Sequence, residues 1–531
     1  MGLWPFSQRK FCVLTLAGAP LGARPYIGAP NWSISGRPQG ASFRLKPVSI
    51  SNSQPFRTPT FLSSSTRDLV ETLGYFKMSQ VLDNLPLEQL FDTEMEADDA
   101  PLDRETYQML MQYDDPWADL KDPHVMMNFY RRIFPWKQLF LWLNQAEVPN
   151  YAFTHREFAV TLQNEAYLRY NSYADHIELQ KDIIRLNPLR FEVGCTYSVQ
   201  PKDRKTVPKA AFKPILRELV FDIDLTDYDG IRRCCSDKQI CKKCWKFMAM
   251  AIEVLDLSLR EDFGFKHLLW IFSGRRGVHC WVSDEKALKL TDELRRALVN
   301  YLDIIKGGAK NGLKVDLKSP LHPAVKRNLN ILKKSFREVV LEDQDVFQNH
   351  ENFLQMWGDM ELQTKFSAKW FSNPGLSSAE KWQEVFDYID QHKADKKKYF
   401  QARDTINNIV LHYSYPRIDL EVSKHMNHLL KSPFCVHPAT GKLCVPIDPT
   451  RAFAFDPTTV PDVRDLLREL DKDSKTNPSG ATEEDNASTK LPGWYYTSLR
   501  PYVEMFQKHI NELIKARSKT TQTTQLHWYK Y

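Results

Sequence analysis

Two acidic residues interrupt an apolar run near the middle of the chain. In residues 219–225, Leu-Val-Phe-Asp-Ile-Asp-Leu, Asp222 and Asp224 alternate with apolar residues, and this alternation predicts a β-strand. A strand places both carboxylates on one face, about 7 Å apart. Such a pair can hold divalent metal ions, and an exposed edge strand with solvated aspartates is the alternative. The residues that follow lack the acid and the glycine of an EF-hand loop, which disfavours calcium sensing.

A cationic turn follows about fifty residues later. Residues 273–279 read Ser-Gly-Arg-Arg-Gly-Val-His and lie between two apolar runs, 268–272 and 278–282, that are predicted strands. Gly274 and Gly277 permit close approach of a ligand, while Arg275 and Arg276 supply charge for a polyphosphate. A solvated basic hairpin is the alternative, and the chain has no P-loop signature. Metal ions together with a polyphosphate point to nucleotidyl or phosphoryl transfer.

Four further polar residues depend on the fold for their meaning. Asp419 lies in a run that alternates after Pro416 and predicts another strand. His428 and Lys431 are three residues apart, a spacing that can place them on one helical face, and His437 follows shortly afterwards. Each would be an ordinary surface or core residue unless the fold places it close to the carboxylates of Asp222 and Asp224.

A cysteine array stands between the acidic strand and the cationic turn. Cys234, Cys235, Cys241 and Cys244 offer four thiolates, the number that a tetrahedral structural zinc requires. A redox pair at 241 and 244, or free buried thiols, are the rival interpretations. No water-activating His or Glu accompanies the cysteines, so the array predicts a structural metal site. The other cysteines are scattered, which favours a reducing compartment over a disulfide framework.

Composition divides the chain into segments. The 531 residues are 42% hydrophobic with a net charge of +6, which indicates a folded protein but does not by itself establish nucleic-acid binding. No apolar run is long enough for a membrane helix. Helices are expected over 245–259 and 290–305, the second ending at Gly307-Gly308. The expected segments are a basic extension (1–77), an acidic linker (78–127), a core (128–283 and 404–515) interrupted by a helical insertion (284–403), a disordered loop (471–490) and a tail (516–531).

The first 67 residues contain eight Lys or Arg and no Asp or Glu. This composition predicts disorder and fits a mitochondrial presequence. The alternative is a misassigned start of translation, with Met78 as the natural beginning. Between Asp83 and Asp122 the balance reverses to thirteen acids against Arg104 and Lys121, a composition typical of a solvated linker.

Taken together, these motifs resemble the small catalytic subunits of eukaryotic DNA primases, in the archaeo-eukaryotic primase superfamily. The resemblance covers about residues 128–506. It implies a mixed α/β (α+β) primase catalytic core with a mainly α-helical insertion and a small zinc-binding motif. The residues that carry it are the acidic strand, the cysteine array and the cationic turn, together with Phe129-Tyr130-Arg131-Arg132, His155-Arg156-Glu157-Phe158, Tyr167-Leu168-Arg169-Tyr170 and the segment from Ser423 to Phe434.

The resemblance also implies roles for individual residues. Asp222, Asp224 and Asp419 are expected to hold two catalytic Mg²⁺ or Mn²⁺ ions, and the four cysteines a structural Zn²⁺. Where the family often has an aspartate, this chain has Glu192, which leaves a ribose contact there unassigned. The expected nucleotide-binding residues are Glu157, Arg169, Ser273, Arg275, Arg276, His279, His428, Lys431 and His437.

The implied activity is DNA-directed synthesis of short RNA primers by nucleotidyl transfer. The expected partners are a large primase subunit that carries an iron–sulfur cluster, the DNA polymerase α complex, a single-stranded DNA template, the RNA primer and nucleoside triphosphates, in the nucleus. A true presequence would instead direct the chain to mitochondria. The alternatives are a stand-alone primase-polymerase of DNA repair and a non-catalytic zinc-stabilised nucleic-acid-binding module.

Overall fold

The computed structural model describes residues 115–305, 311–476 and 491–528. The expectations for residues 1–77, and for the linker as far as residue 114, lie outside these ranges. Among the described helices, none combines the length and the apolar character that crossing a bilayer requires.

The first sheet is antiparallel and is centred on β3 (Arg190–Tyr197). One edge of β3 pairs with β1 (Arg156–Thr161), which pairs in turn with β2 (Tyr167–Asn171). The other edge pairs with two short strands, β8 (Leu430–Lys431) beside Glu192 and Val193, and β4 (Pro214–Leu216) beside Thr196 and Tyr197. Residues near 430 are therefore held beside residues near 192.

The second sheet carries the acidic strand. It has the order β5-β7-β6-β9 and is antiparallel throughout, and it consists of β5 (Leu219–Asp224), β6 (Leu268–Phe272), β7 (Gly277–Val282) and β9 (Pro446–Ile447). The predicted strands at 219–225, 268–272 and 278–282 are confirmed. Phe221 and Ile223 are buried, whereas Asp222 and Asp224 are half-buried, so the alternation separates an apolar face from a polar one.

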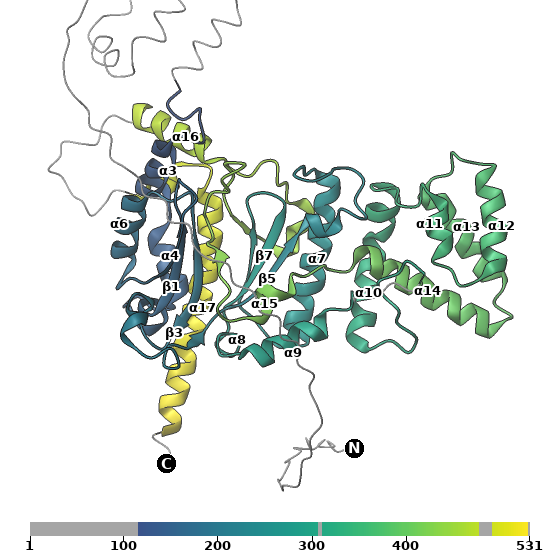
Figure 1. The fold of residues 1–531 in the computed structure, drawn as a ribbon, viewed down its shortest axis with the longest axis horizontal. Helices are drawn as coiled ribbons and strands as arrows, with labels where there is room; N and C mark the ends of the chain where they lie inside the picture. Colours follow the sequence, from purple (N-terminus) through teal and green to yellow (C-terminus); the bar gives the residue numbers. More distant parts are fainter. Residues whose placement is uncertain (1–114, 306–310, 477–490, 529–531) are drawn as a thin grey trace, which may run out of the picture. The chain divides into compact units, whose positions relative to one another are not determined.

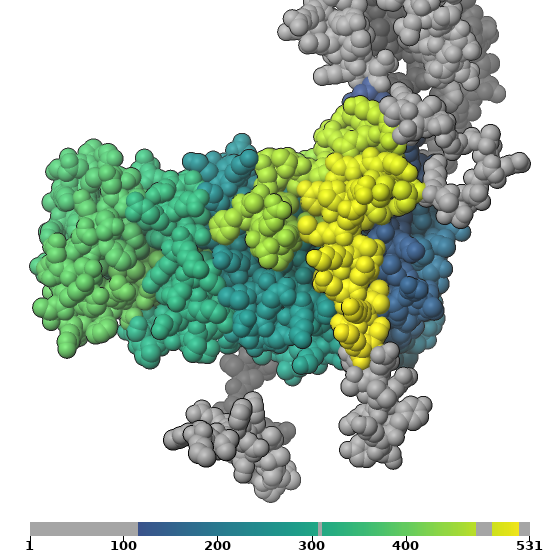
Figure 2. Space-filling model, turned by 180° about the vertical axis from the view of Figure 1, so that it is seen from behind, coloured from purple at the N-terminus to yellow at the C-terminus, as the bar shows by residue number. Residues whose placement is uncertain are grey.

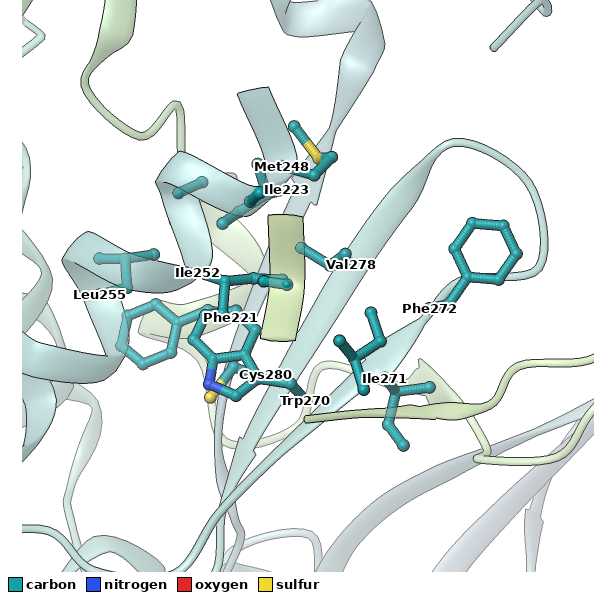
Figure 3. Packing of buried hydrophobic residues seen from close by; sticks show 14 of the residues in the cluster. Phe221, Ile223, Met248, Ile252, Leu255, Trp270, Ile271, Phe272, Val278 and Cys280 are labelled. Carbon is teal, nitrogen blue, oxygen red and sulfur yellow. The ribbon is translucent and has the colours of Figure 1, made fainter. Parts of the chain in front are cut away.

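Helix α7 (Lys242–Glu261) covers the apolar face of this sheet, and it includes the predicted helix 245–259. Met248, Ile252 and Leu255 on one side of α7 lie beside Phe221, Ile223 and Val278 (Figure 3). The helix begins after Cys241, which stands at its N-cap position. Residues 242–244 are therefore helical, and the last two cysteines of the array stand on the first turn of a core helix.

A second group of helices accompanies the first sheet. Helix α17 (Arg500–Trp528) contacts α4 and β9. It is the yellow ribbon in Figure 1, and its yellow atoms lie on the face shown in Figure 2. Within the predicted tail of 516–531, the backbone as far as Trp528 continues this helix. The other elements of this group are α3 (Pro123–Asn128), η3 (Phe129–Ile133), α4 (Trp136–Asn144), α5 (Tyr151–Thr154), α6 (His176–Leu186), η4 (Pro201–Thr206), α16 (Val463–Thr476) and η8 (Gly493–Tyr496).

Helices dominate the described residues between 285 and 414. α14 continues to Ser414, so the segment boundary predicted at 403/404 falls inside a helix. α9 ends at Leu302, earlier than the predicted end at Gly307-Gly308, and residues 306–310 lie outside the described ranges. The elements are α8 (Glu285–Leu288), α9 (Asp292–Leu302), α10 (Pro323–Phe336), η6 (Arg337–Glu342), α11 (His350–Gln355), α12 (Met360–Phe371), α13 (Ser378–Gln391) and α14 (Lys396–Ser414); η5 (Leu225–Tyr228), α15 (Leu420–Lys424) and η7 (Pro449–Ala454) lie outside this span.

Part of the predicted acidic linker is folded. Arg468 on α16 binds Asp115 at 2.6 Å, and Asp471 accepts hydrogen bonds from Trp117 and Arg132, each at 2.7 Å. Asp115 and Trp117 of the predicted solvated linker (78–127) are therefore held against α16. The predicted disordered loop is wrong over 471–476, which belong to α16, whereas 477–490 lie outside the described ranges. Paired charges account for both differences, because composition does not show which acids find cations.

The mixed α/β fold with antiparallel sheets is confirmed, and a buried ion pair ties its two sheets together. Arg156 of β1 binds Glu218, the residue before β5, through bonds of 2.7 and 3.0 Å, and both side chains are 1% exposed. Arg217 adds a contact of 3.5 Å to the same carboxylate, and its burial lowers its pKa to about 10. The second sheet is thus held to the first sheet at Glu218, four residues before Asp222.

Removing one partner of this ion pair should strongly destabilise the fold. Glu218→Gln leaves Arg156 buried without its countercharge, so the free energy of unfolding should fall by about 3–5 kcal/mol. Urea unfolding followed by circular dichroism measures this change. Arg185→Met, which breaks the exposed pair with Asp182, is the matched control and should cost less than about 1 kcal/mol. Equal losses in the two variants would contradict the clamping role.

Candidate active site

The two carboxylates of β5 lie beside β7, the strand that follows the cationic turn. Asp222 is opposite His279 and Asp224 is opposite Gly277 in the register of the two strands. His279 Nε2 lies 3.6 Å from Asp222 Oδ1. Because hydrogen bonding of the backbone fixes this register, the acidic pair and the end of the cationic turn are held on adjacent strands.

Asp419 reaches the same place from a distant part of the chain. Its backbone N–H donates to the carbonyl of Asp222 at 3.0 Å. The predicted strand after Pro416 is wrong, because Asp419 is instead the N-cap of α15 and accepts from the N–H groups of Glu421 and Val422. Capping a helix by an aspartate satisfies N–H groups that otherwise have no partner. The cap fixes Asp419 beside β5.

The charges of these three aspartates act on one another. Burial, followed by the charges of Asp224 and Asp419, raises the pKa of Asp222 to about 7. The half-exposed Asp227 nearby also has a raised pKa, mainly through burial and the same two charges. A divalent cation would relieve this repulsion, so the donor set fits the hard, oxygen-preferring ions Mg²⁺ and Mn²⁺. Among the described residues, the group of metal-ligating side chains found within 4.8 Å of one another is the cysteine cluster and not these three aspartates.

Arg276 forms an ion pair with Asp224. Its Nε donates to Asp224 Oδ1 at 2.7 Å, and Thr226 donates to the same oxygen from its hydroxyl at 2.6 Å and from its N–H at 2.8 Å. Burial alone would raise the pKa of Asp224, but the bonds from Thr226 and Arg276 lower it. Arg276 Nη1 also donates to the carbonyl of Asp237 at 3.0 Å. Because Asp237 stands between Cys235 and Cys241, the cysteine loop and the acidic strand hold one guanidinium between them.

The turn itself is closed by its own backbone and hydroxyl. Ser273 Oγ accepts from the N–H of Gly277 at 3.0 Å. Gly274 has φ +83, and a Cβ there would meet His437 Cβ and the Lys442 carbonyl at 2.9 Å. A Cβ on Gly277 would meet the Ile223 carbonyl at 2.6 Å. Both glycines are therefore required by local space and conformation, besides any approach of a ligand.

Lys431 and His437 border the turn. Lys431 lies on β8 rather than on the predicted helix, and its Nζ donates to the carbonyl of Ser273 at 2.6 Å. Burial and the charges of Lys431 and Arg275 lower the pKa of His437 to about 3. Arg190 acts on His437 in the same direction, and its Nε is buried without a partner among the described residues. Arg190 is thus a further cation of this cluster that no sequence motif singled out.

His279 is a neutral imidazole at the centre of these charges. Burial and the nearby Lys431 lower its pKa to about 3. Its Nδ1 is buried and makes no hydrogen bond to any described residue. An unsatisfied buried ring nitrogen is costly in an apolar site, and such atoms often have a ligand or water as partner. The arrangement suits a hydrogen bond to a bound anion.

Glu157 and Arg169 form a second polar group on the first sheet. Glu157 is buried and binds Arg169 at 2.9 and 3.2 Å, and it also accepts from the hydroxyl of Tyr197 at 3.1 Å. Arg169 reaches the carbonyl of Asn427 at 3.5 Å, a residue of the segment between Asp419 and β8. Glu192, opposite Lys431, accepts from the hydroxyl of Tyr167 at 2.6 Å.

His428 is not on a helical face with Lys431, because the residues between α15 and β8 are irregular. Its ring is half-buried, and its backbone carbonyl accepts from Arg217 at 3.2 Å. Burial, followed by the charge of Arg217, lowers the pKa of His428, and the charge of Asp419 opposes this. It therefore lies within electrostatic reach of the acidic group.

The cysteine cluster has the geometry of a metal site. The sulfurs of Cys234, Cys235, Cys241 and Cys244 all lie within 4.8 Å of one another, and the last two are 3.8 Å apart. A tetrahedron with Zn–S bonds of about 2.3 Å has S–S edges of about 3.8 Å. The Gln344 amide also donates to Cys234 at 3.3 Å. Hydrogen bonds from Cys244 and then Gln344 help to lower the pKa of Cys234 to about 5.

Comparisons with known proteins identify the family of this chain. The DNA primase small subunit of Schizosaccharomyces pombe is 47% identical over 411 residues, which cover 74% of this chain and 90% of the relative. The chain belongs to the DNA primase small subunit family. The family member from Saccharomyces cerevisiae is 37% identical over 73% of this chain and 91% of its own length. The Drosophila melanogaster member is 37% identical over 74% and 92%, respectively.

The family model described as DNA primase small subunit matches residues 221–449. That range begins within β5 and ends at the start of η7, so it contains the three aspartates, the cysteine cluster, the cationic turn, Lys431 and His437. Glu157, Arg169 and Arg190 lie before it.

Proposed function

We propose that this chain is the catalytic subunit of a DNA primase, which synthesises RNA primers on a DNA template. Family membership supports the assignment. The observation that carries it is the meeting of Asp222, Asp224 and Asp419, from two distant segments, opposite a group of cations. Carboxylates suit metal ions, and cations suit the triphosphate of a nucleotide, so the two groups together favour nucleotidyl transfer.

The proposed reaction joins the 3′-oxygen of the primer to the α-phosphorus of a nucleoside triphosphate and releases pyrophosphate. Two Mg²⁺ or Mn²⁺ ions held by the three aspartates would supply Lewis-acid activation of the hydroxyl and neutralise charge at the phosphorus. The chain's own cations serve the leaving group. Arg275, Arg276 and Lys431 would neutralise the β- and γ-phosphates, and neutral His279 would donate one hydrogen bond to them.

The side chain of Arg276 has two roles in this proposal. Arg276 neutralises Asp224 in this structure, and it would turn to the triphosphate when the carboxylate of Asp224 serves as a metal ligand. The second bond, to the carbonyl of Asp237, keeps the guanidinium at the mouth of the turn. Ser273, Glu157, Arg169, His428 and His437 complete the proposed nucleotide-binding set. The four cysteines hold a structural zinc that braces the loop carrying Asp237.

The proposed partners follow from the family. A large subunit, with its own iron–sulfur cluster, and the DNA polymerase α complex would assemble with this chain in the nucleus. Among the described residues, the metal-ligating cluster is the cysteine array, so the iron–sulfur cluster is assigned to the partner. A mitochondrial address depends on residues 1–67, which lie outside the described ranges.

Primer synthesis on a poly-pyrimidine template, with and without Mn²⁺, tests the proposal. The full-length chain should make short ribonucleotide products only when a divalent metal is present. Preference for deoxynucleotides would favour a stand-alone repair primase-polymerase. Absence of any polymerisation, with DNA still bound, would favour a non-catalytic zinc-stabilised module.

Arg276→Ala should chiefly weaken nucleotide binding. Loss of a charge-assisted contact to phosphate is worth about 1.5–3 kcal/mol, so the KM for the nucleotide should rise about 10- to 100-fold. Steady-state primer extension measures this change, and Arg276→Lys should recover part of it. Arg296→Ala, which removes an exposed guanidinium of α9, is the control. A KM unchanged from that of the native chain would contradict the role of Arg276.

A further inference from the structure

A strongly basic loop borders the first sheet, and the proposed catalytic set does not use it. The loop is defined here as residues 201–213, and it runs from η4 to the start of β4. It contains five cations, Lys202, Arg204, Lys205, Lys209 and Lys213, and one acid, Asp203. The four lysines are exposed, and Arg204 is half-buried.

Among the residues that the structure describes, the cations of the basic loop have no acidic partner in an ion pair. None of the five forms an ion pair within 4.0 Å with a carboxylate of the described residues, although ion pairs are frequent elsewhere on the chain. The charge of this loop is therefore not cancelled locally. Five cations and one acid give the loop a formal charge of +4 (5 − 1), against +6 for the whole chain.

The basic loop is held rigidly against the sheet. Phe212 stacks on Tyr197 with ring centroids 4.1 Å apart, and Arg204 lies 4.2 Å above the ring of Tyr170. The backbone of Lys213 exchanges two hydrogen bonds with Ser198, at 2.9 and 3.0 Å. A preorganised loop loses little conformational entropy on binding, so its charges are presented at low cost.

The same aromatic residues connect the basic loop to the candidate active site. Tyr197 donates to Glu157, and the N–H of Tyr170 donates to the same carboxylate at 3.2 Å. Tyr170 has φ 67, a strained conformation for a non-glycine residue that the contacts on both sides maintain. Arg169 lies 4.9 Å from the ring of Tyr170, so Arg204 of the loop and Arg169 of the candidate site contact the same ring.

We propose that the basic loop binds the phosphate backbone of single-stranded DNA and guides the template toward Arg169. Unpaired cations on a fixed surface favour a polyanion, and the exposed ring of Tyr167 on the neighbouring strand β2 offers a stacking surface that unpaired bases can use. Duplex DNA keeps its bases stacked inside, so the single strand is the better match. This inference rests on the proposed function, because it names where the template of that reaction lies.

Removal of three loop charges tests this proposal directly. The full-length variant Lys205→Gln/Lys209→Gln/Lys213→Gln should bind a fluorescein-labelled oligothymidylate about 10- to 100-fold more weakly near 0.1 M salt. The slope of log K against log salt should fall by about 2, since each phosphate contact on a single strand contributes about 0.7. Fluorescence anisotropy at several salt concentrations measures both quantities.

A matched control distinguishes the loss of charge in the basic loop from the loss of the same charge elsewhere on the chain. Lys326→Gln/Lys396→Gln/Lys397→Gln removes the same charge from exposed sites on α10 and α14 and should leave affinity and slope near those of the native chain. Equal weakening in both variants would overturn the proposal. Unchanged DNA binding by the loop variant would also overturn the proposal. This holds even if the variant binds polyglutamate, a polyanionic peptide, less well than the native chain does.

The readout also distinguishes this inference from the proposed function. DNA binding is measured without nucleotides, so a chain that fails to make primers can still show loop-dependent binding. Conversely, if primers are made and the loop variant binds DNA normally, only the loop assignment fails. Melting temperatures equal to that of the native chain would show that both triple variants are folded.

Discussion

Asp222→Asn should abolish primer synthesis while leaving the fold intact. The amide can no longer supply an anionic ligand at the centre of the acidic group, where Asp224 and Asp419 already act on Asp222. Loss of metal-dependent charge stabilisation worth several kcal/mol lowers the rate by about 1,000-fold or more. Primer extension with saturating nucleotide and Mn²⁺ measures the loss. Asp387→Asn on α13 makes the same chemical change far along the chain and should leave the rate unaltered.

Thermal melting gives this prediction a second readout that does not depend on catalysis. Because repulsion and burial raise the pKa of Asp222, the neutral amide should not lower the melting temperature in the absence of metal ions. Adding Mn²⁺ should raise the melting temperature of the native chain and have less effect on Asp222→Asn. Retained primer synthesis by the variant, or an equal response of both proteins to Mn²⁺, would refute the assigned role.

The parts of the site that could be predicted from the sequence are those that local sequence patterns determine. The period of two in residues 219–225 put Asp222 and Asp224 on one face, and the glycine-flanked turn ended in a strand that pairs with theirs. Asp419 was found as a candidate but given the wrong structure. The alternation after Pro416 competes there with an aspartate at a helix N-cap, and the cap prevails because the backbone of Asp419 is also bonded to β5.

Residues whose meaning arises only from tertiary contacts were missed. Arg190 has no motif of its own, and it joins the cationic group because β3 pairs with β8. Glu218 precedes the acidic strand and looks like another surface acid, yet Arg156 from the first sheet makes it a buried clamp. The ion pair of Asp115 was missed for the same reason, since its partner Arg468 lies far along the chain. Long-range ion pairs leave no periodic trace in a sequence.

The cysteine spacing predicted the number of ligands but not what surrounds them. Gln344, from the residues after η6, donates to Cys234, and Arg232 donates to the carbonyls of Asp237 and Gln239 at 2.8 and 2.9 Å. The cluster therefore joins three parts of the fold: the loop after β5, the first turn of α7 and the helical segment. A metal ion held there would tie all three together.

Removing that metal should destabilise the protein more than any single surface change. Structural zinc sites of four cysteines bind with free energies of about 10 kcal/mol or more, and binding energy of this kind is folding energy. Cys241→Ala should therefore lower the melting temperature by about 10 °C or more and abolish the stoichiometric zinc that we expect in the native chain. Differential scanning fluorimetry and elemental analysis measure the two effects.

The control is another free cysteine, because the four sulfurs must be distinguished from thiols in general. Cys195→Ala removes a buried thiol on β3, away from the cluster, and should keep the zinc and most of the stability. The two variants should also differ in function. Loss of the cluster releases the loop that holds Arg276 through Asp237, so the KM for the nucleotide should rise in whatever folded fraction of Cys241→Ala survives, and not in Cys195→Ala. Native protein without zinc, stable and unaffected by chelators, would mean that the four cysteines are reduced thiols and that the loop is braced by its hydrogen bonds alone.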